Sequence, residues 1–434
     1  MDLSSIFQNG LFALTILCSY PLSYLIRRFV APSYRAYFHI WFGFMICLYL
    51  YSFNFLIVLG YLVLAYFMLL LKGKLLFLGL LIPMIALGVI HSYRYMHIGQ
   101  WKSDISGLIM FTSLRLWTLI FNIYDGRQKE VKRKNWKNVV VEKQPNFITY
   151  IAYLFSYSAL YSGPLIPFNA FLELLEMEHD RNNEDLKFGL ISWLQSLGFC
   201  IIYGIGVKLI PVEFIVSNKF IEMPYLLRLL ISILECFLHI SRYIFAWLGG
   251  ESGFRALGIS HVKSIDFDDC RSIKLSIYFN LGSISDLSRE WNHTIHYMLK
   301  EYIHVRIIAC GFSNIFARTL TFLFSAYWHG FLPGYYILAF LEMFVGYFDN
   351  YRIKNFNPLL EKYIGERALK CFSIIWTHSM NFFMGAPFDL YWGSKFLEFY
   401  QIMKFGPFIA LLVMDIIGFI YKIMKPKEIK PKKE

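Results

Sequence analysis

The stretch Ser-Ala-Tyr-Trp-His-Gly-Phe-Leu-Pro-Gly-Tyr-Tyr, residues 325–336, places an ionisable side chain, His329, directly after an apolar run over residues 307–324. An ionisable group in the hydrocarbon region of a membrane costs about 2.5–3.5 kcal/mol, so where one occurs it usually has a function. A histidine bonded to a neighbouring carbonyl is the simpler interpretation, and for a lone histidine it is the commoner one. Pro333 and Gly334 are expected to break or kink the helix and so to fix how the imidazole projects.

The composition indicates a polytopic membrane protein. The chain has 434 residues, of which 57% are hydrophobic and 19% aromatic, and its mean hydropathy is +0.48. The net charge of +12 could suggest a nucleic-acid partner, but the basic residues lie at the ends of apolar runs and in short loops. That distribution follows the positive-inside rule, so we expect no nucleic-acid binding. The seven cysteines form no Cys-x-x-Cys pair and are expected to be small core residues.

A helix needs about 20 apolar residues to cross the hydrocarbon layer, and such runs recur along the chain. We therefore predict an all-α bundle of about eleven transmembrane helices with an internal reaction cavity. One membrane domain is expected in three parts, residues 1–103, 104–400 and 401–434. The candidate runs are residues 7–26, 37–71 (two helices, with a break near Gly60), 75–90, 104–124, 147–162, 188–210, 224–248, 307–328, 335–348, 369–384 and 402–424.

Charged segments predict the orientation. Residues 127–143 contain seven basic and two acidic side chains, which is typical of a cytosolic loop. Six lysines and two glutamates follow Tyr421, so the C-terminus is expected in the cytosol as well. Lys430 and Lys432 stand fifth and third from the end, as in the dilysine signal that retrieves membrane proteins to the endoplasmic reticulum. A solvated charge run is an equally good interpretation of this tail.

Asn292 is the residue that His329 would need as a partner. Each of the two follows a tryptophan, and two segments packed antiparallel would bring both side chains to one cavity. A neutral histidine can take a proton from a hydroxyl, and an amide can donate to an oxygen that gains charge. A general base and an amide donor are the smallest set of catalytic groups that could transfer an acyl group to an alcohol.

Several motifs together resemble one family. The Trp291-Asn292 pair and residues 325–336 look like the lysophospholipid acyltransferase branch of the membrane-bound O-acyltransferase (MBOAT) family. The resemblance extends over residues 104–400. It also includes Asp104-Ile105-Ser106-Gly107, Asn122-Ile123-Tyr124-Asp125-Gly126, Gly163-Pro164, Pro167-Phe168 and Met384-Gly385-Ala386-Pro387-Phe388. Ser288-Arg289-Glu290 before Trp291 departs from the sterol and diacylglycerol branches.

The resemblance implies an MBOAT-like fold in the endoplasmic-reticulum membrane and an acyl-CoA:lysophospholipid O-acyltransferase active in phospholipid remodelling. His329 is implied as the general base and Asn292 as the second catalytic residue. Acyl-CoA would be a co-substrate, with no bound cofactor and no metal. The string around His329 looks closer to lysophosphatidylinositol enzymes, whereas residues 104–107 look closer to the choline, ethanolamine and serine enzymes. The residues implied in substrate binding are Trp291, Tyr327, Trp328, Gly330, Pro333, Gly334 and Tyr335.

Other interpretations stay open at this level. Ser325 lies four residues before His329, where helix neighbours more often only hydrogen-bond than act as nucleophile and base. Asn292-His293-Thr294 is also an N-glycosylation sequon, and a lumenal glycan would exclude catalysis by Asn292. Arg127, Lys129 and Lys132 would attract CoA phosphates or, more simply, form a topogenic loop. A protein O-acyltransferase and a transporter are the alternative functions.

Overall fold

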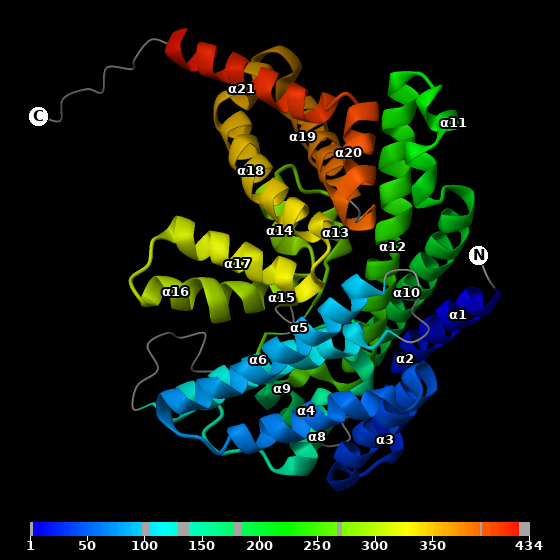
Figure 1. The fold of residues 1–434 in the computed structure, drawn as a ribbon, viewed down its shortest axis with the longest axis vertical. Helices are drawn as coiled ribbons and strands as arrows, with labels where there is room; N and C mark the ends of the chain where they lie inside the picture. Colours follow the sequence, from blue (N-terminus) through cyan, green and yellow to red (C-terminus); the bar gives the residue numbers. More distant parts are fainter. Residues whose placement is uncertain are drawn as a thin grey trace, which may run out of the picture. The chain divides into compact units, whose positions relative to one another are not determined.

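The computed structural model describes residues 3–97, 104–128, 139–177, 184–266, 271–390 and 393–424, and every regular element in these ranges is a helix (Figure 1). The helices are α1 (Leu3–Leu17), α2 (Ser19–Phe29), α3 (Pro32–Tyr51), α4 (Phe55–Met68), α5 (Leu81–Met96), α6 (Ser106–Gly126), α8 (Phe147–Leu154), α9 (Phe168–Glu176), α10 (Glu184–Leu209), α11 (Asn218–Ile221), α12 (Tyr225–Leu257), α13 (Leu275–Tyr278), α14 (Ile284–Glu290), α15 (His293–Met298), α16 (Val305–Ala309), α17 (Asn314–His329), α18 (Pro333–Asn355), α19 (Asn357–Asp389), α20 (Gly393–Ile402) and α21 (Gly406–Met424).

The expectation of an all-helical, multi-pass membrane protein is confirmed. Within the described ranges, seven helical stretches are long and apolar enough to cross a membrane. The count is lower than the predicted eleven because α8 has only 8 residues and α17 only 16, while α18 and α19 are long but more polar. The seven stretches are Gly10–Phe29, Pro32–Met68, Gly73–Met96, Ser106–Gly126, Glu184–Val216, Tyr225–Leu257 and Gly406–Met424.

The predicted break near Gly60 is wrong. Gly60 lies inside α4, and the long apolar run is interrupted instead at the 3₁₀ turn Ser52–Asn54. Ser52 there has a positive φ of 53°, which ends α3. A glycine without a special dihedral is tolerated in a helix at a cost of about 1 kcal/mol, so its presence alone did not locate the break.

The prediction of a single span over residues 307–328 is also wrong. The chain turns between α16 and α17, at residues 310–313. Gly311 adopts a φ of 93°, as glycine does where helices end, and the Ser313 side chain accepts a hydrogen bond from the backbone N–H of Phe316 at 3.2 Å, as an N-cap does. These stop and start signals divide one apolar run into two short helices.

The structure divides into two compact units. The first unit comprises residues 1–205, 240–273 and 292–331, and the second comprises residues 206–239, 274–291 and 332–434. The first is organised around α6, whose most apolar window is 83% buried, against 11% for the stretch Glu184–Val216. Helix α6 is therefore an interior helix, packed against α5 and α8.

Arg115 shows how α6 connects the elements around it. This arginine is buried in the apolar core, and its guanidinium donates hydrogen bonds to the carbonyls of Tyr153 (3.0 Å), Leu154 (2.9 Å) and Ala159. Two of these carbonyls belong to the last turn of α8, where the regular hydrogen bonds of the helix run out, and the Tyr153 carbonyl also accepts a long 3.5 Å hydrogen bond from the N–H of Ser156. A buried charge that satisfies three carbonyls fixes the α8 end against α6.

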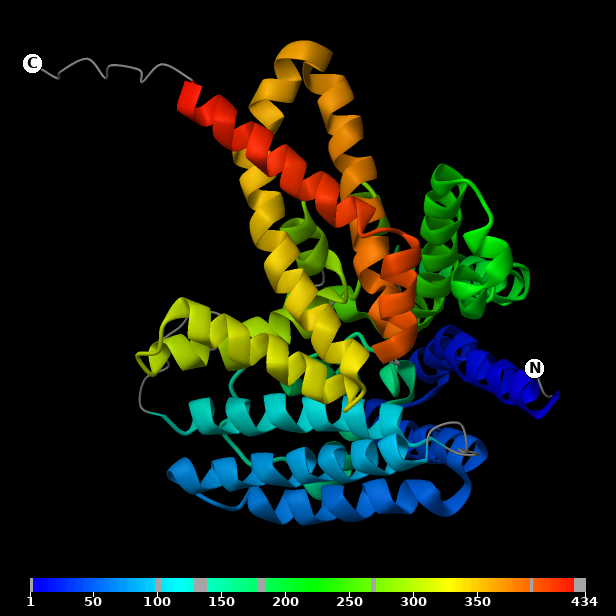
Figure 2. The same ribbon diagram turned by 45° about the horizontal axis from the view of Figure 1, so that its top comes forward.

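The second unit is built on a helical hairpin. Helices α18 and α19 pack against each other, and α21 lies alongside them (Figure 2). Apolar side chains from α14, α18, α19 and α21 meet between these helices. They are Ile284, Val345, Met380, Met384 and Leu411.

Replacing Arg115 by methionine should destabilise the first unit by about 1–3 kcal/mol, because the three buried carbonyls lose their donors. The measurement is thermal unfolding of the detergent-solubilised protein. Arg318→Met is the matched control, since the Arg318 guanidinium only lies over the Phe322 ring at 5.8 Å. Equal melting temperatures for the two variants would contradict this assignment.

Candidate active site

Both predicted catalytic residues lie in one helical hairpin of the first unit. The first arm is continuous from residue 293 to residue 309 and consists of α15, the π-helical segment η7 (Leu299–His304) and α16. The second arm is α17, which packs antiparallel to the first (Figures 1 and 2). At about 1.5 Å per residue each arm is about 25 Å long. Because Asn292 begins the first arm and His329 ends the second, the two lie at the same, open end of the hairpin.

Asn292 has an unusual backbone. It adopts the left-handed conformation, with φ 48° and ψ 54°, which asparagine tolerates better than most residues. Its carbonyl accepts hydrogen bonds from the N–H groups of Ile295 (2.9 Å) and His296 (3.0 Å), so its main chain starts α15. Its side-chain Oδ1 is buried and has no hydrogen-bond partner within the described part of the chain. An acceptor held in this way is available to a substrate group.

Two contacts anchor the residues that follow Asn292. The N–H of His293 donates to the carbonyl of Ser272 at 2.8 Å. The Thr294 side chain is buried, and its hydroxyl accepts a hydrogen bond from the N–H of Leu165 at 3.1 Å. Leu165 directly follows Gly163-Pro164, one of the motifs that resemble the family. The start of α15 is thus fixed by segments far away in the sequence.

The first arm is bound to α6 by two polar pairs. Tyr302 donates to Asn122 Oδ1 at 2.8 Å. Arg306 pairs with Asp125 through both terminal nitrogens of its guanidinium, Nη1 and Nη2, with Nη1 and Oδ1 3.1 Å apart. Asn122 and Asp125 both belong to the motif of residues 122–126 that resembles the family, so the structure shows a structural role for this motif. It sets the position of the arm that starts at Asn292.

The second arm is fixed at its end, next to His329. Tyr327 donates to the carbonyl of Met84 on α5 at 2.7 Å, and the indole of Trp328 donates to the carbonyl of Met110 on α6 at 2.9 Å. Gly330 then ends the helix with φ 137° and ψ −169°, a conformation open essentially to glycine alone. The helix therefore ends at His329 itself, earlier than the predicted break at Pro333 and Gly334. The half-buried imidazole lies with its centroid 4.6 Å from that of the Trp328 ring.

The other residues predicted to bind substrate belong to the second unit. Trp291 follows the last residue of α14, and its ring lies 5.9 Å from that of Tyr278. Pro333 is the first residue of α18 and Gly334 the second, so this dipeptide starts a helix. The ring of Tyr335 lies 5.1 Å from that of Phe388.

The structure shows backbone contacts for Arg127, for which the sequence left open an attraction of CoA phosphates or, more simply, a place in a topogenic loop. Its guanidinium donates to the carbonyls of Leu71 (2.7 Å) and Leu69 (3.0 Å), just past the end of α4. Lys129, Lys132 and the lysine-rich tail lie outside the described residues. Among the residues that are described, no group of three or more His, Cys, Asp and Glu side chains could hold a metal ion.

One functional candidate, His91, was missed by sequence reasoning. It lies on α5, is 1% exposed, and its Nε2 is 3.0 Å from the carbonyl oxygen of Trp328. The available signal was the same one that drew attention to His329, namely a histidine at the end of an apolar run.

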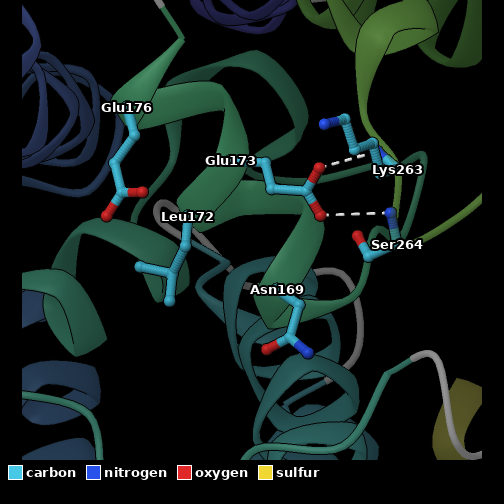
Figure 3. A pocket seen from close by; sticks show the side chains of 6 residues that line it. All are labelled: Asn169, Leu172, Glu173, Glu176, Lys263 and Ser264. Carbon is cyan, nitrogen blue, oxygen red and sulfur yellow. Dashed lines mark hydrogen bonds between the residues drawn. The ribbon is translucent and has the colours of Figure 1, made fainter.

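A surface pocket of the first unit lies between α9 and residues 263–264 (Figure 3). Its central carboxylate, Glu173, accepts hydrogen bonds from the backbone N–H groups of Lys263 (2.6 Å) and Ser264 (3.1 Å). Neither Asn292 nor His329 lines it. The carboxylate is used to hold a loop against α9, so this pocket is separate from the hairpin site.

The comparison with known families agrees with the hairpin site. The sequence profile of the membrane-bound O-acyltransferase family matches residues 72–385. The chain belongs to this family. The matched range includes Asn292, His329, and the α5 and α6 residues that hold the hairpin, so the site lies within the MBOAT region.

Individual relatives are similar at low identity. A Saccharomyces cerevisiae protein named lysophospholipid acyltransferase is 24% identical over an alignment of 394 residues, which covers 80% of this chain and 63% of the relative. A Schizosaccharomyces pombe protein with the same name is 24% identical over 289 residues, covering 63% of this chain and 57% of the relative. Human membrane-bound glycerophospholipid O-acyltransferase 1 is 22% identical over 376 residues, covering 76% of this chain and 70% of the relative. The chain thus spans less than two thirds of either yeast protein.

Asp125→Asn should lower the stability of this MBOAT chain by about 3–5 kcal/mol, because it leaves Arg306 without its carboxylate in a largely buried place. Thermal unfolding in detergent measures the effect. The matched control is Asp286→Asn, which breaks the exposed pair with Arg289 and should cost at most about 1 kcal/mol. Similar losses in both variants would show that the Asp125–Arg306 pair does not hold the first arm.

The sequon at Asn292 should carry no glycan in the folded protein, because the Thr294 hydroxyl is buried and bonded and Asn292 Oδ1 is buried. We expect peptide N-glycosidase to leave the electrophoretic mobility of the wild type and of Asn292→Gln unchanged. A shift in the wild type that is absent from Asn292→Gln would place Asn292 in the lumen and exclude it from catalysis.

Proposed function

We propose that this protein is an acyl-CoA-dependent lysophospholipid O-acyltransferase of the endoplasmic-reticulum membrane. The observation that carries the proposal is the placement of Asn292 and His329 at one end of a hairpin within the MBOAT-matched region. The names of the yeast relatives support the lysophospholipid as acceptor. The lysine-rich tail supports the organelle, as the sequence pattern predicted.

The reaction is a direct transfer between two lipids. The free glycerol hydroxyl of the lysophospholipid attacks the thioester carbonyl of acyl-CoA, an ester C–O bond forms, and the thioester C–S bond breaks. His329 takes the proton from the hydroxyl as the attack proceeds and returns it to the departing CoA thiolate. No charge or atom is left over, and neither a metal nor an acyl-enzyme is needed.

Asn292 supplies orientation in this scheme. One N–H of its amide nitrogen donates a hydrogen bond to the oxygen of the attacking hydroxyl, which leaves the hydroxyl proton directed at His329. Its amide group donates to the oxygen of the tetrahedral intermediate, whose negative charge it stabilises. The left-handed backbone and the anchors at His293 and Thr294 keep the side chain in place, so little reorganisation is required.

The other residues predicted to bind substrate are proposed to contact it through van der Waals packing. Tyr327 and Trp328 use their polar atoms on the backbones of α5 and α6, so they meet the acyl chain or the lysolipid with their ring surfaces. Gly330 directly follows His329 in the chain, and the family resemblance proposes Trp291, Pro333, Gly334 and Tyr335 as further substrate-binding residues. CoA is proposed to arrive from the cytosol and the lysolipid from the bilayer.

His329→Ala should lower acyl transfer by about 100-fold or more, since general-base catalysis contributes about 10²–10⁴-fold. Microsomes that contain the protein are given labelled acyl-CoA and a panel of lysophospholipids, and the labelled phospholipids are quantified. His304→Ala is the matched control, because His304 lies in the same hairpin but near the turn, where it contacts Asn314 at 3.0 Å. Full activity in His329→Ala at normal expression would defeat the proposal.

The same experiment separates the alternatives. A protein O-acyltransferase would label a polypeptide rather than a phospholipid, and His329→Ala would abolish that label. A transporter would move its substrate in liposomes without any acyl transfer.

A further inference from the structure

The end of α17 needs an external hydrogen-bond donor. The last four carbonyls of a helix lack the N–H that would follow four residues later. Trp328 is the penultimate residue of α17, and Gly330 turns the chain away with a φ of 137°. The Trp328 carbonyl, one peptide bond before His329, must therefore be satisfied by another part of the molecule.

His91 provides that donor. Its Nε2 lies 3.0 Å from the Trp328 carbonyl oxygen. Because a carbonyl only accepts hydrogen bonds, Nε2 carries the proton and Nδ1 has the free lone pair. The His91 side chain is 1% exposed, and Nδ1 is buried with no partner among the described residues. The bond to Trp328 is thus the hydrogen bond that the structure shows for this buried imidazole.

The ring of His91 also fits between the residues on either side of His329. It lies edge to face with Tyr327, at 6.5 Å between centroids and 88°, and with Phe331, at 5.9 Å and 67°. One side chain of α5 therefore contacts the residue before Trp328, the Trp328 carbonyl and the residue after Gly330. His91 therefore holds the chain segment on both sides of His329 in place.

Further contacts fix α5, which carries His91, against α6. Arg94, one turn further along α5, pairs with Asp104 at 3.5 Å, and Asp104 accepts a hydrogen bond from the N–H of Ser106 at the start of α6. These contacts join α5 to α6, and α6 in turn accepts the hydrogen bond from the Trp328 indole. The position of His91 is therefore set relative to the same helix that sets the arm of Asn292.

We propose that His91 is a positioning residue for the acyl-transfer reaction, which holds the main chain at Trp328 and so keeps the His329 imidazole directed at the acceptor hydroxyl. The kinetic part of this inference rests on the proposed function. Displacing a catalytic group by about 1 Å can cost on the order of 100-fold in rate, so the loss of one main-chain hydrogen bond is enough to matter.

Three variants of similar size separate this role from packing. In His91→Gln the amide nitrogen reaches about as far as Nε2 and can donate to the Trp328 carbonyl. His91→Asn has the same amide but is shorter, and His91→Leu fills the space without a donor. We expect a fall in kcat of about 10- to 100-fold for His91→Asn and His91→Leu with little change in KM, and substantial rescue in His91→Gln.

Hydrogen–deuterium exchange gives a readout that requires no acyl transfer. The peptide that covers residues 326–332 should exchange on the order of tenfold faster in His91→Asn and His91→Leu, and near the wild-type rate in His91→Gln. His39→Leu is the matched control, because His39 is equally buried on α3 but contacts Ser156 at 3.2 Å instead of α17. It should leave exchange in residues 326–332 and kcat unchanged.

Each outcome of these two experiments either supports the positioning role of His91 or contradicts it. Unaltered exchange in both His91→Asn and His91→Leu, or a His91→Gln variant as inactive as His91→Leu, would overturn the positioning role. Faster exchange in the two variants, reversed by glutamine, supports it even if no lysophospholipid is acylated, in which case only the proposed function fails. If His91→Leu does not fold, the comparison of His91→Gln with His91→Asn carries the test.

Discussion

The polar side chains of α6 are the constraint on which the first unit depends. A helix buried on nearly all sides in a membrane protein has no water to satisfy polar groups, so each must find a partner within the chain. Arg115 binds the end of α8, Asn122 binds Tyr302, and Asp125 binds Arg306. The first contact fixes α8 against α6, and the other two fix the first arm of the hairpin against it. The apolar residues of α6 provide the burial, and its polar residues determine which neighbour lies where.

The candidate site follows from this arrangement. One arm of the hairpin is held along its length by α6, and the other is held at its end by α5 and α6. The two catalytic candidates then stand at helix termini, where the backbone leaves regular geometry at Asn292 and Gly330. Two such termini at one end of a hairpin can converge on one substrate.

The second unit solves the same problem with its own polar set. The Arg352 guanidinium, which is fully buried, donates to Asp349 at 2.9 Å and to Asn357 at 2.8 Å. Asp349 also accepts a hydrogen bond from the N–H of Ile284 at 2.9 Å, which fixes α14 to α18. Asp349 thus pairs with Arg352 on its own helix and at the same time holds the start of α14.

The sequence by itself determined the class of protein and most of the apolar helices, and it predicted Asn292 and His329 as the catalytic pair, because hydrophobic run length and short motifs are local properties. Only the tertiary structure decided that the chain breaks at Ser52 and not at Gly60, that residues 310–313 divide one run into two helices, and that His91 supports the turn after Trp328. These features depend on backbone dihedrals and on contacts between residues as far apart as 91 and 328. An apolar pattern shows how much of a helix can be buried, but it does not show which neighbouring element buries it.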